Sequence, residues 1–233
     1  MQAVILAAGE GKRLRPHTEH LPKPMILVQG RPILEYVIAA LPEAVDEAIV
    51  VVGYKGETIK DYFGNTIWNK RITYVEDVAP KGTGYALQAA RPFLEDDFFL
   101  LLNGDDLYHP EDLQAVSLRR PTVFVTESPH PERFGVCLID EEGKLARIIE
   151  KPSQPPSNLV NTGGYILNHE IFDVPIPILP NGEWNLAEQV GDLARRRPVY
   201  VHEARFWNPI NRIEELEEAR SRNLQDIYPF MMR

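Results

Sequence analysis

AVILAAGEGKRLRPHTEHLPKP, residues 3–24, decides the fold, because an apolar run here ends abruptly in a glycine-rich turn. A short apolar run bounded by glycines is typical of a strand buried on both faces, as in a parallel sheet. Gly9 and Gly11 let the backbone turn tightly and approach a ligand, since they have no Cβ. Consecutive N–H groups in such a turn form a concavity that binds anions. The stretch therefore predicts a polyphosphate cradle at the carboxyl end of the first strand.

Basic side chains follow the glycines and strengthen this interpretation. Arg13 and Lys23 add positive charges for the same anion, and Lys23 stands between two prolines that fix the local backbone. The stretch has no GxxxxGK[ST] spacing, and Leu14 stands where a dinucleotide fingerprint has its third glycine. The alternative is a glycine-rich turn that binds nothing, and from this stretch alone it stays open.

Beyond this stretch, strands alternate with helices through the first half of the chain. This order is typical of βαβ units around a parallel sheet. Apolar runs predict strands at 48–52, 72–76 and 98–102. Helical spacing predicts helices at 31–41, 53–62 and 82–90.

The second half is richer in short strands. Strands are expected at 122–126, 135–139, 145–149, 164–167 and 199–203, and helices at 186–196 and 213–223. Residues 140–143 (DEEG) read as a hairpin turn. We therefore expect a mixed sheet with a mainly antiparallel second half, within a single domain over residues 1–233 that divides into halves 1–116 and 117–233.

Composition narrows the class of protein. The chain has 233 residues and a net charge of −9, so a basic nucleic-acid-binding surface is not expected. The single cysteine, Cys137, excludes an intrachain disulfide and is expected in the core. No stretch is long and apolar enough to span a membrane, and no signal peptide precedes the first strand. These features predict a cytoplasmic enzyme that binds neither nucleic acid nor membrane.

Two carboxylates follow the strand expected at 98–102. Ligands of open α/β sheets bind just beyond the carboxyl ends of strands. Asp105 is therefore placed to hold Mg²⁺, which prefers hard oxygens and shares substrate phosphates. Asp106 either supports Asp105 or is a simple loop residue. The alternative for both is a loop with two solvated acids.

Several segments together resemble the sugar-nucleotidyltransferases, which make a nucleoside-diphospho-sugar and pyrophosphate from a sugar-1-phosphate and an NTP. The resemblance covers nearly the whole chain, with its motifs in the family's order. It is carried by residues 9–18 (GEGKRLRPHT), 22–24 (PKP), 82–87 (GTGYAL), 103–105 (NGD), 134–136 (FGV), 150–152 (EKP) and 161–165 (NTGGY).

The resemblance implies a Rossmann-like three-layer α/β/α sandwich with a mixed, mainly parallel sheet and an antiparallel sugar-binding portion. It also implies NTP and sugar-1-phosphate as substrates and Mg²⁺ as cofactor. The first half would bind nucleotide and the second half the sugar phosphate. The implied catalytic residues are Arg13, Lys23 and Asp105, the last as metal ligand. The implied nucleotide-binding residues are Leu6, Ala7, Ala8, Gly9, Gly11, Arg13, Lys23, Asp77, Gly82 and Thr83. The implied sugar-phosphate-binding residues are Gly135, Glu150, Lys151 and Asn161.

Asp77 departs from the family pattern, which commonly has a base-reading glutamine five residues before the GT motif. An ionised carboxylate only accepts hydrogen bonds, so it favours a base edge with two donors, such as guanine. Uracil and thymine present one donor between two acceptors. The alternative is that Asp77 faces solvent and the backbone alone reads the base.

The second metal ligand also departs from the usual aspartate. Asn211 fits the asparagine form of the family's late motif best, and Asn208 is a second candidate. An amide oxygen can coordinate Mg²⁺ but carries no charge. The alternative for Asn211 is an N-cap of the helix expected from Ile213.

The sequence leaves the sugar, the base and the oligomeric state open. The chain ends soon after its last predicted helix, so no appended acyltransferase or β-helix domain is expected. A homo-oligomer would need a surface, which the apolar tail at Ile227, Phe230, Met231 and Met232 could supply. Two alternatives to the enzyme remain: an inactive nucleotide-sugar-binding regulatory subunit, and a nucleotidyltransferase for a non-sugar phosphate.

Overall fold

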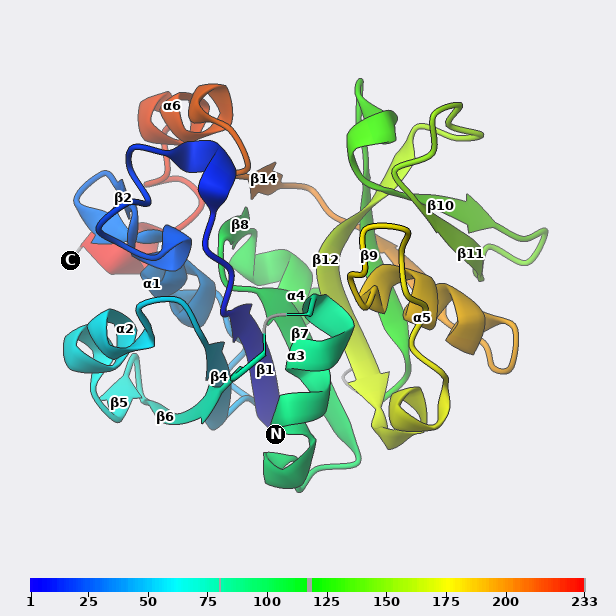
Figure 1. Ribbon diagram of the computed structural model, residues 1–233, viewed down its shortest axis with the longest axis horizontal. Coiled ribbons are helices and arrows are strands. Elements are labelled where there is room, and N and C mark those ends of the chain that lie inside the picture. The colour runs from blue at the N-terminus through cyan, green and yellow to red at the C-terminus, as the bar shows by residue number, and fades with distance from the viewer. Residues whose placement is uncertain (80, 117–118, 233) are drawn as a thin grey trace.

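A single ten-stranded sheet runs through both halves of the chain in the computed structural model, which describes residues 1–79, 81–116 and 119–232 (Figure 1). Its main path is β11-β10-β12-β7-β1-β4-β6-β5, and β9 pairs with both β12 and β13. The strands of the first half are β1 (Gln2–Ala7), β4 (Glu47–Val52), β5 (Thr66–Ile67), β6 (Lys70–Glu76) and β7 (Phe98–Asn103). Those of the second half are β9 (Thr122–Glu127), β10 (Gly135–Ile139), β11 (Leu145–Glu150), β12 (Leu159–Asn168) and β13 (Tyr200–Glu203).

The first strand lies at the centre of the parallel part, between β4 and β7. Its residues alternate between the two faces of the sheet. Ala3 and Ile5 pack into one apolar cluster, and Val4 and Leu6 pack into the other. Both faces are covered, which is why the strand reads as an unbroken apolar run.

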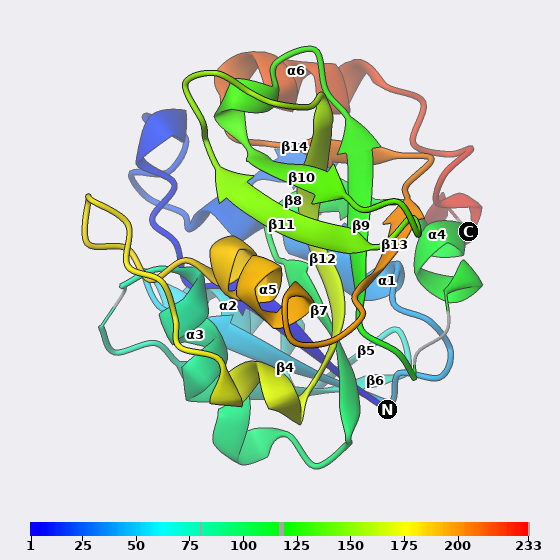
Figure 2. The same cartoon turned by 90° about the vertical axis from the view of Figure 1, so that its right-hand side faces the viewer.

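Helices cover both faces of the sheet and complete three layers (Figures 1 and 2). One face packs against α1 (Ile33–Ala39), α2 (Gly56–Phe63), α4 (Pro110–Ala115) and α6 (Ile213–Ser221). The other face packs against α3 (Thr83–Ala90) and α5 (Leu186–Ala194). The expected three-layer α/β/α fold with a mixed sheet is confirmed. None of the described helices is long and apolar enough to cross a membrane.

All of the predicted helices and strands occur, most with ends shifted by a few residues. The largest difference is β12, which is longer than the strand predicted at 164–167. Its pairing with β9 shifts register between Asn161 and Tyr165. Such a bulge breaks the two-residue alternation on which strand prediction depends. The predicted hairpin turn is present, with the Gly143 N–H donating to the carbonyl of Asp140 at 3.1 Å.

Two short pairs of strands were not predicted. Strand β8 (Asp106–Tyr108) pairs with β14 (Trp207–Pro209), and β2 (Leu27–Val28) pairs with β3 (Arg31–Pro32), where a helix was expected to begin. Each strand has only two or three residues, too few to show a periodicity. The β8–β14 pair joins segments one hundred residues apart in the chain, and only the tertiary fold brings them together.

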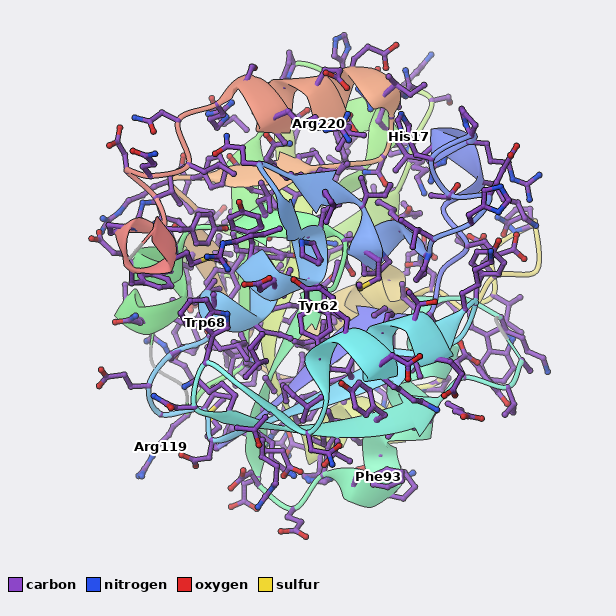
Figure 3. All side chains as sticks on the ribbon, turned by 90° about the vertical axis from the view of Figure 1, so that its left-hand side faces the viewer. His17, Tyr62, Trp68, Phe93, Arg119 and Arg220 are labelled. Carbon is purple, nitrogen blue, oxygen red and sulfur yellow. The ribbon has the colours of Figure 1, made fainter. Side chains whose placement is uncertain are left out.

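Part of the apolar tail packs on the chain itself. Met231 is fully buried, and the Tyr228 hydroxyl donates to the carbonyl of Tyr108 at 2.5 Å. Phe230 meets Trp68 edge to face, with ring centroids 6.2 Å apart. Figure 3 shows this side of the molecule, with Trp68 labelled. Met231 is therefore part of the core, whereas Phe230 stays 38% exposed, so a role of the tail in an oligomer remains a prediction.

Candidate functional site

A cavity of about 590 Å³ opens at the carboxyl ends of β1 and β7 and extends to the antiparallel part of the sheet. Both halves of the chain line it. The predicted site residues among its lining are Leu6, Gly9, Gly11, Arg13, Lys23, Gly82, Thr83, Asp105, Gly135, Glu150, Lys151, Asn161 and Asn211. Within the described ranges, four candidates lie outside that lining: Ala7, Ala8, Asp77 and Asn208.

The glycine-rich turn lies directly against Lys23. Gly11 has a φ of +65°, and a Cβ there would come within 2.8 Å of the Lys23 Cβ. The Thr18 hydroxyl donates to the carbonyl of Gly11 at 2.9 Å and holds the turn from the other side. Gly9 has open space around it, with nothing within 4 Å of where a Cβ would stand. The turn thus combines a fixed backbone with room for a ligand, as the sequence predicted.

Lys23 joins the two residues proposed as metal ligands. It begins a 3₁₀ turn (Lys23–Met25) behind Pro22, and it is only 5% exposed. Its Nζ lies 2.6 Å from Asp105 Oδ2 and 3.2 Å from Asn211 Oδ1. Three segments far apart in the sequence therefore meet at one ammonium group. The reading of Asp105 as a merely solvated loop acid does not fit this contact.

The oxygens around that ammonium suit a magnesium ion. A carboxylate and an amide oxygen are hard donors, and Mg²⁺ often takes only one or two protein carboxylates and shares the phosphates of its substrate. The described parts of the chain, this site included, hold no group of three or more His, Cys, Asp or Glu side chains that could bind a metal without a substrate. Asp105 and Asn211 are therefore a donor set that fits Mg²⁺ bound together with a triphosphate.

The structure distinguishes between the two asparagines that are candidates for the second metal ligand. Asn208 is 3% exposed, and its Nδ2 donates to the carbonyl of Pro209. Asn211 instead turns its side chain into the cavity. The N-cap position of α6 belongs to Arg212, and Glu215 accepts from the N–H groups of Asn211 at 2.6 Å and Arg212 at 3.2 Å. Capping of α6 by the Asn211 side chain, the alternative left open by the sequence, is not observed.

Asp106 is not a simple loop residue. Its carboxylate is buried, and it accepts three hydrogen bonds of 3.3 Å. The donors are Asn103 Nδ2, Trp207 Nε1 and the N–H of Ile210. Burial and, next to it, the nearby charge of Asp105 together raise the pKa of Asp106 to about 7. The side chain supports the loop that carries Asp105, which was the other reading of the sequence.

The sugar-phosphate candidates form the opposite wall. Gly135 and Glu150 are partners across β10 and β11, and a Cβ on Gly135 would lie 3.2 Å from Glu150 Oε2. Lys151 follows at once and its Nζ lies 2.7 Å from Glu150 Oε1. Asn161 stands at the bulge of β12, where its Oδ1 accepts from the Gly163 N–H at 2.8 Å. The wall offers an ammonium, a carboxylate and an amide at one end of the cavity.

Two tryptophans, which would be expected to pack in the core, also line the cavity. Trp184 belongs to a loop docked on the start of α3, where its carbonyl accepts from the Gly84 N–H at 2.9 Å. Gly82 has a φ of +114°, and a Cβ there would lie 2.7 Å from the same carbonyl. Trp207 comes from β14. Only the loop docking and the β8–β14 pairing bring these rings to the site, and no local motif marks either ring.

Asp77 is buried rather than solvent-facing, so that part of the alternative is wrong, while a base read by the backbone alone stays open. It is 7% exposed, and its Oδ1 accepts from the Ala79 N–H at 3.2 Å. Burial raises the pKa of its carboxyl above the ordinary value. The proposed role of Asp77 in reading the base stays a prediction.

Comparison with known proteins shows the family of this chain. Residues 2–224 match the nucleotidyl transferase family. The UTP–glucose-1-phosphate uridylyltransferase AglF of Haloferax volcanii is 37% identical over 234 residues, covering 95% of this chain and 96% of that protein. The bifunctional protein GlmU of Methanocaldococcus jannaschii is 36% identical over 230 residues, covering 97% of this chain and 55% of that protein. The chain thus spans about half the length of the GlmU relatives it matches.

Solved structures match the fold over its full extent. UDP-glucose pyrophosphorylase complexed with UDP-glucose aligns with a TM-score of 0.83 at 24% identity, covering 100% of this chain and 99% of that one. At that identity the likeness speaks for the fold alone. The family match and the AglF and GlmU relatives show more: this chain belongs to the nucleotidyl transferase family, and within it to the sugar nucleotidyltransferases.

Proposed function

We propose that the chain transfers a nucleoside monophosphate from an NTP to a sugar-1-phosphate, forming an NDP-sugar and releasing pyrophosphate. The observation that supports this most is the meeting of Lys23, Asp105 and Asn211 at one point of the cavity. A regulatory subunit that only bound nucleotide-sugar would have no need of this cluster. Arg13 and the turn at 9–11 line the same cavity and add the groups that a triphosphate requires.

The proposed chemistry asks for positioning and charge, with no covalent intermediate on the protein. An oxygen of the sugar phosphate attacks the α-phosphorus, and the bond from that phosphorus to the pyrophosphate oxygen breaks. The attacking oxygen is already ionised at neutral pH, so no general base is needed. Arg13 and Lys23 would neutralise the charge that develops on the α-phosphate and the leaving pyrophosphate.

The remaining site residues would hold the two substrates in line. The N–H groups of the turn would bind phosphate oxygens, and Leu6, Gly82 and Thr83 would contact the base. The sugar and its phosphate would lie against the cavity wall that is formed by Gly135, Glu150, Lys151 and Asn161. Asp105 and Asn211 would hold Mg²⁺, which supplies positive charge to the phosphate oxygens when bound.

For the substrates themselves we infer UTP and a glucose-1-phosphate-type hexose phosphate. The support is the full-length similarity to AglF, whose name gives that pair. Asp77 favours the opposite choice, a guanine base, because its carboxylate only accepts hydrogen bonds. A preference for GTP would therefore support the assignment of Asp77 to the base.

The test is pyrophosphate release from the purified protein with Mg²⁺, each of five NTPs and several sugar-1-phosphates, with the NDP-sugar identified by mass. Asp105→Asn is the control variant. It should lower turnover by about 100-fold or more, with an unchanged melting temperature, because it removes the charged ligand. Silence of the wild-type protein across the panel would favour a regulatory subunit, and near-normal turnover of Asp105→Asn would remove that residue from the metal site.

A further inference from the structure

We propose that Asp106 is a positioning residue that fixes Asn211 in place as a metal ligand, without touching the metal or the substrates itself. This inference rests on the function proposed above. It starts from the Asp106 side chain, which is 3% exposed and stands next to Asp105, at the start of β8.

Asp106 lines the cavity, and most of its hydrogen bonds run to one neighbouring segment. Both carboxylate oxygens already have donors: Oδ1 has the Ile210 N–H, and Oδ2 has Trp207 Nε1 and Asn103 Nδ2. Two of these three donors belong to the segment 207–210, which leads directly into Asn211. A carboxylate that accepts from three donors has little capacity left for a cation.

The same segment is held from its other end by Glu215. That carboxylate accepts from the Asn211 N–H at 2.6 Å and pairs with Arg133, which comes from the opposite wall of the cavity. Asn211 is thus fixed between two carboxylates, one bonded to the residue before it and one bonded to its own N–H. Its amide oxygen carries no charge, so correct placement is the main contribution it can make to metal binding.

The Asp106 carboxylate connects the segment to the Asp105 loop through two side-chain hydrogen bonds, in addition to the β8–β14 backbone pairing. In Asp106→Asn, an amide N–H₂ replaces one acceptor oxygen and faces a donor. Either the Ile210 N–H or the Trp207 indole N–H is then left unpaired, and the segment must shift to relieve it. Residues that orient metal ligands typically affect metal affinity or activity by 10–100-fold.

Asp112 offers a matched control. It is also a buried carboxylate, 1% exposed, and it accepts from the N–H groups of Arg205 at 2.8 Å and Phe206 at 3.4 Å. It therefore holds the residues just before the segment 207–210. Asp112 does not line the cavity formed by the described residues and makes no contact with 207–211 through its hydrogen bonds.

The experiment measures Mn²⁺ affinity by calorimetry, in the presence of a non-hydrolysable NTP analogue, for Asp106→Asn, Asn211→Ala, the double variant and Asp112→Asn. We expect Asp106→Asn to weaken Mn²⁺ binding by about 10-fold or more. The double variant should bind no more weakly than Asn211→Ala alone, because Asp106 acts through Asn211. Asp112→Asn should lower the melting temperature but leave the Mn²⁺ affinity unchanged.

Four outcomes would overturn the inference. If the double variant binds Mn²⁺ more weakly than Asn211→Ala, Asp106 is itself a ligand. If Asp112→Asn loses as much affinity as Asp106→Asn, the role of Asp106 is merely structural. Wild-type affinity in Asp106→Asn beside a weakened Asn211→Ala would reject the positioning role and leave the proposed function standing. An unaffected Asn211→Ala would instead remove Asn211 from the metal site, and the proposed function would lose its second ligand.

If Asp106→Asn does not fold, Trp207→Phe replaces it in the same cycle. This variant removes one donor to Asp106 and keeps the carboxylate. We expect a smaller loss of Mn²⁺ affinity, which should again vanish in the Asn211→Ala background. A loss that persists there would contradict the positioning role.

Discussion

Lys23 shows how a single residue can serve two states of the site. Its ammonium lies between the Asp105 carboxylate and the Asn211 amide oxygen, the two groups that would hold Mg²⁺. An ammonium in that position neutralises Asp105 and fills the space between the two oxygens. When metal and triphosphate bind together, the lysine would have to turn from the oxygens toward the phosphates.

Replacing Lys23 should therefore have opposite effects on metal binding and on turnover. Lys23→Met should bind Mn²⁺ several-fold more tightly than the wild type in the absence of nucleotide, since the competing cation is gone. Turnover should fall by about 100-fold or more, because a charge that stabilises the transition state is lost. Calorimetry with Mn²⁺ and steady-state assays measure the two effects, and Lys60→Met, which removes a charge paired with Glu57 and Glu76 outside the cavity lining, controls for net charge. Weaker metal binding in Lys23→Met would contradict this account.

Asp77 carries a second prediction at the same scale. Asp77→Gln gives the side chain a donor as well as an acceptor, which suits the mixed edge of uracil or thymine. The ratio of kcat/KM for UTP over GTP should rise by about tenfold, a change equivalent to about one hydrogen bond. The ratio comes from pyrophosphate-release assays with each nucleotide. An unchanged ratio would remove Asp77 from base recognition.

Among the elements, the bulge of β12 does most to shape the sugar side of the cavity. Gly163 has a φ of +76°, and a Cβ on it would come within 2.1 Å of Asn103 Nδ2. The glycine allows β12 to pass closely over the end of β7, and its N–H holds the Asn161 side chain. The position of Asn161 therefore depends on a backbone conformation that only glycine adopts easily.

Gly163→Ala should lower stability and weaken sugar-phosphate binding together. The matched control is Gly143→Ala, since Gly143 has a φ of +77° and nothing within 4 Å of a Cβ. The control isolates the cost of the backbone conformation, about 1 kcal/mol. In Gly163→Ala the clash adds to it, so the free energy of unfolding should fall by at least twice as much. Urea unfolding and the KM for sugar phosphate measure both effects, and equal losses in the two variants would show that the close approach costs nothing.

For the whole molecule, Glu47 joins three neighbouring strands at the amino edge of the sheet. It accepts from Gln2 on β1 at 2.9 Å and from Thr73 at 2.6 Å and Arg71 at 3.0 Å on β6. The hydrogen bond from Arg71 is the main cause that lowers the pKa of Glu47 to about 2. A pKa lowered by folding stabilises the folded state above the unfolded pKa, and that stability is lost as the pH falls through the folded value.

Glu47→Gln should therefore be less stable than the wild type at pH 7, and the difference should shrink between about pH 4.5 and pH 2. At neutral pH we expect a loss of about 2 kcal/mol in the free energy of unfolding, allowing for the exposure of Arg71. Urea unfolding at several pH values gives the difference. Glu76→Gln, which removes an exposed partner of Lys60, should leave the stability nearly unchanged. A difference that stays constant down to pH 2 would contradict the role of the Glu47 charge.

The sequence by itself determined the alternation of strands and helices and the turn at 9–11. It also marked Lys23 and Asp105 as candidate site residues. These features are local: periodicity, glycines after an apolar run and charged residues at strand ends are visible in short windows. The bulge at Gly163, the burial of the tail and the β8–β14 pair were not visible there, because each depends on contacts between distant segments.

Tertiary structure alone decided which residues share the cavity. Asn211 and Asn208 have the same chemistry and stand three positions apart, yet only Asn211 reaches Lys23, because Asp106 and Glu215 fix the backbone between β14 and α6. Trp184 and Trp207 reach the cavity in the same way, through a docked loop and a pair of short strands. Local pattern sets the elements of a chain, but the packing of those elements sets the direction in which each side chain points.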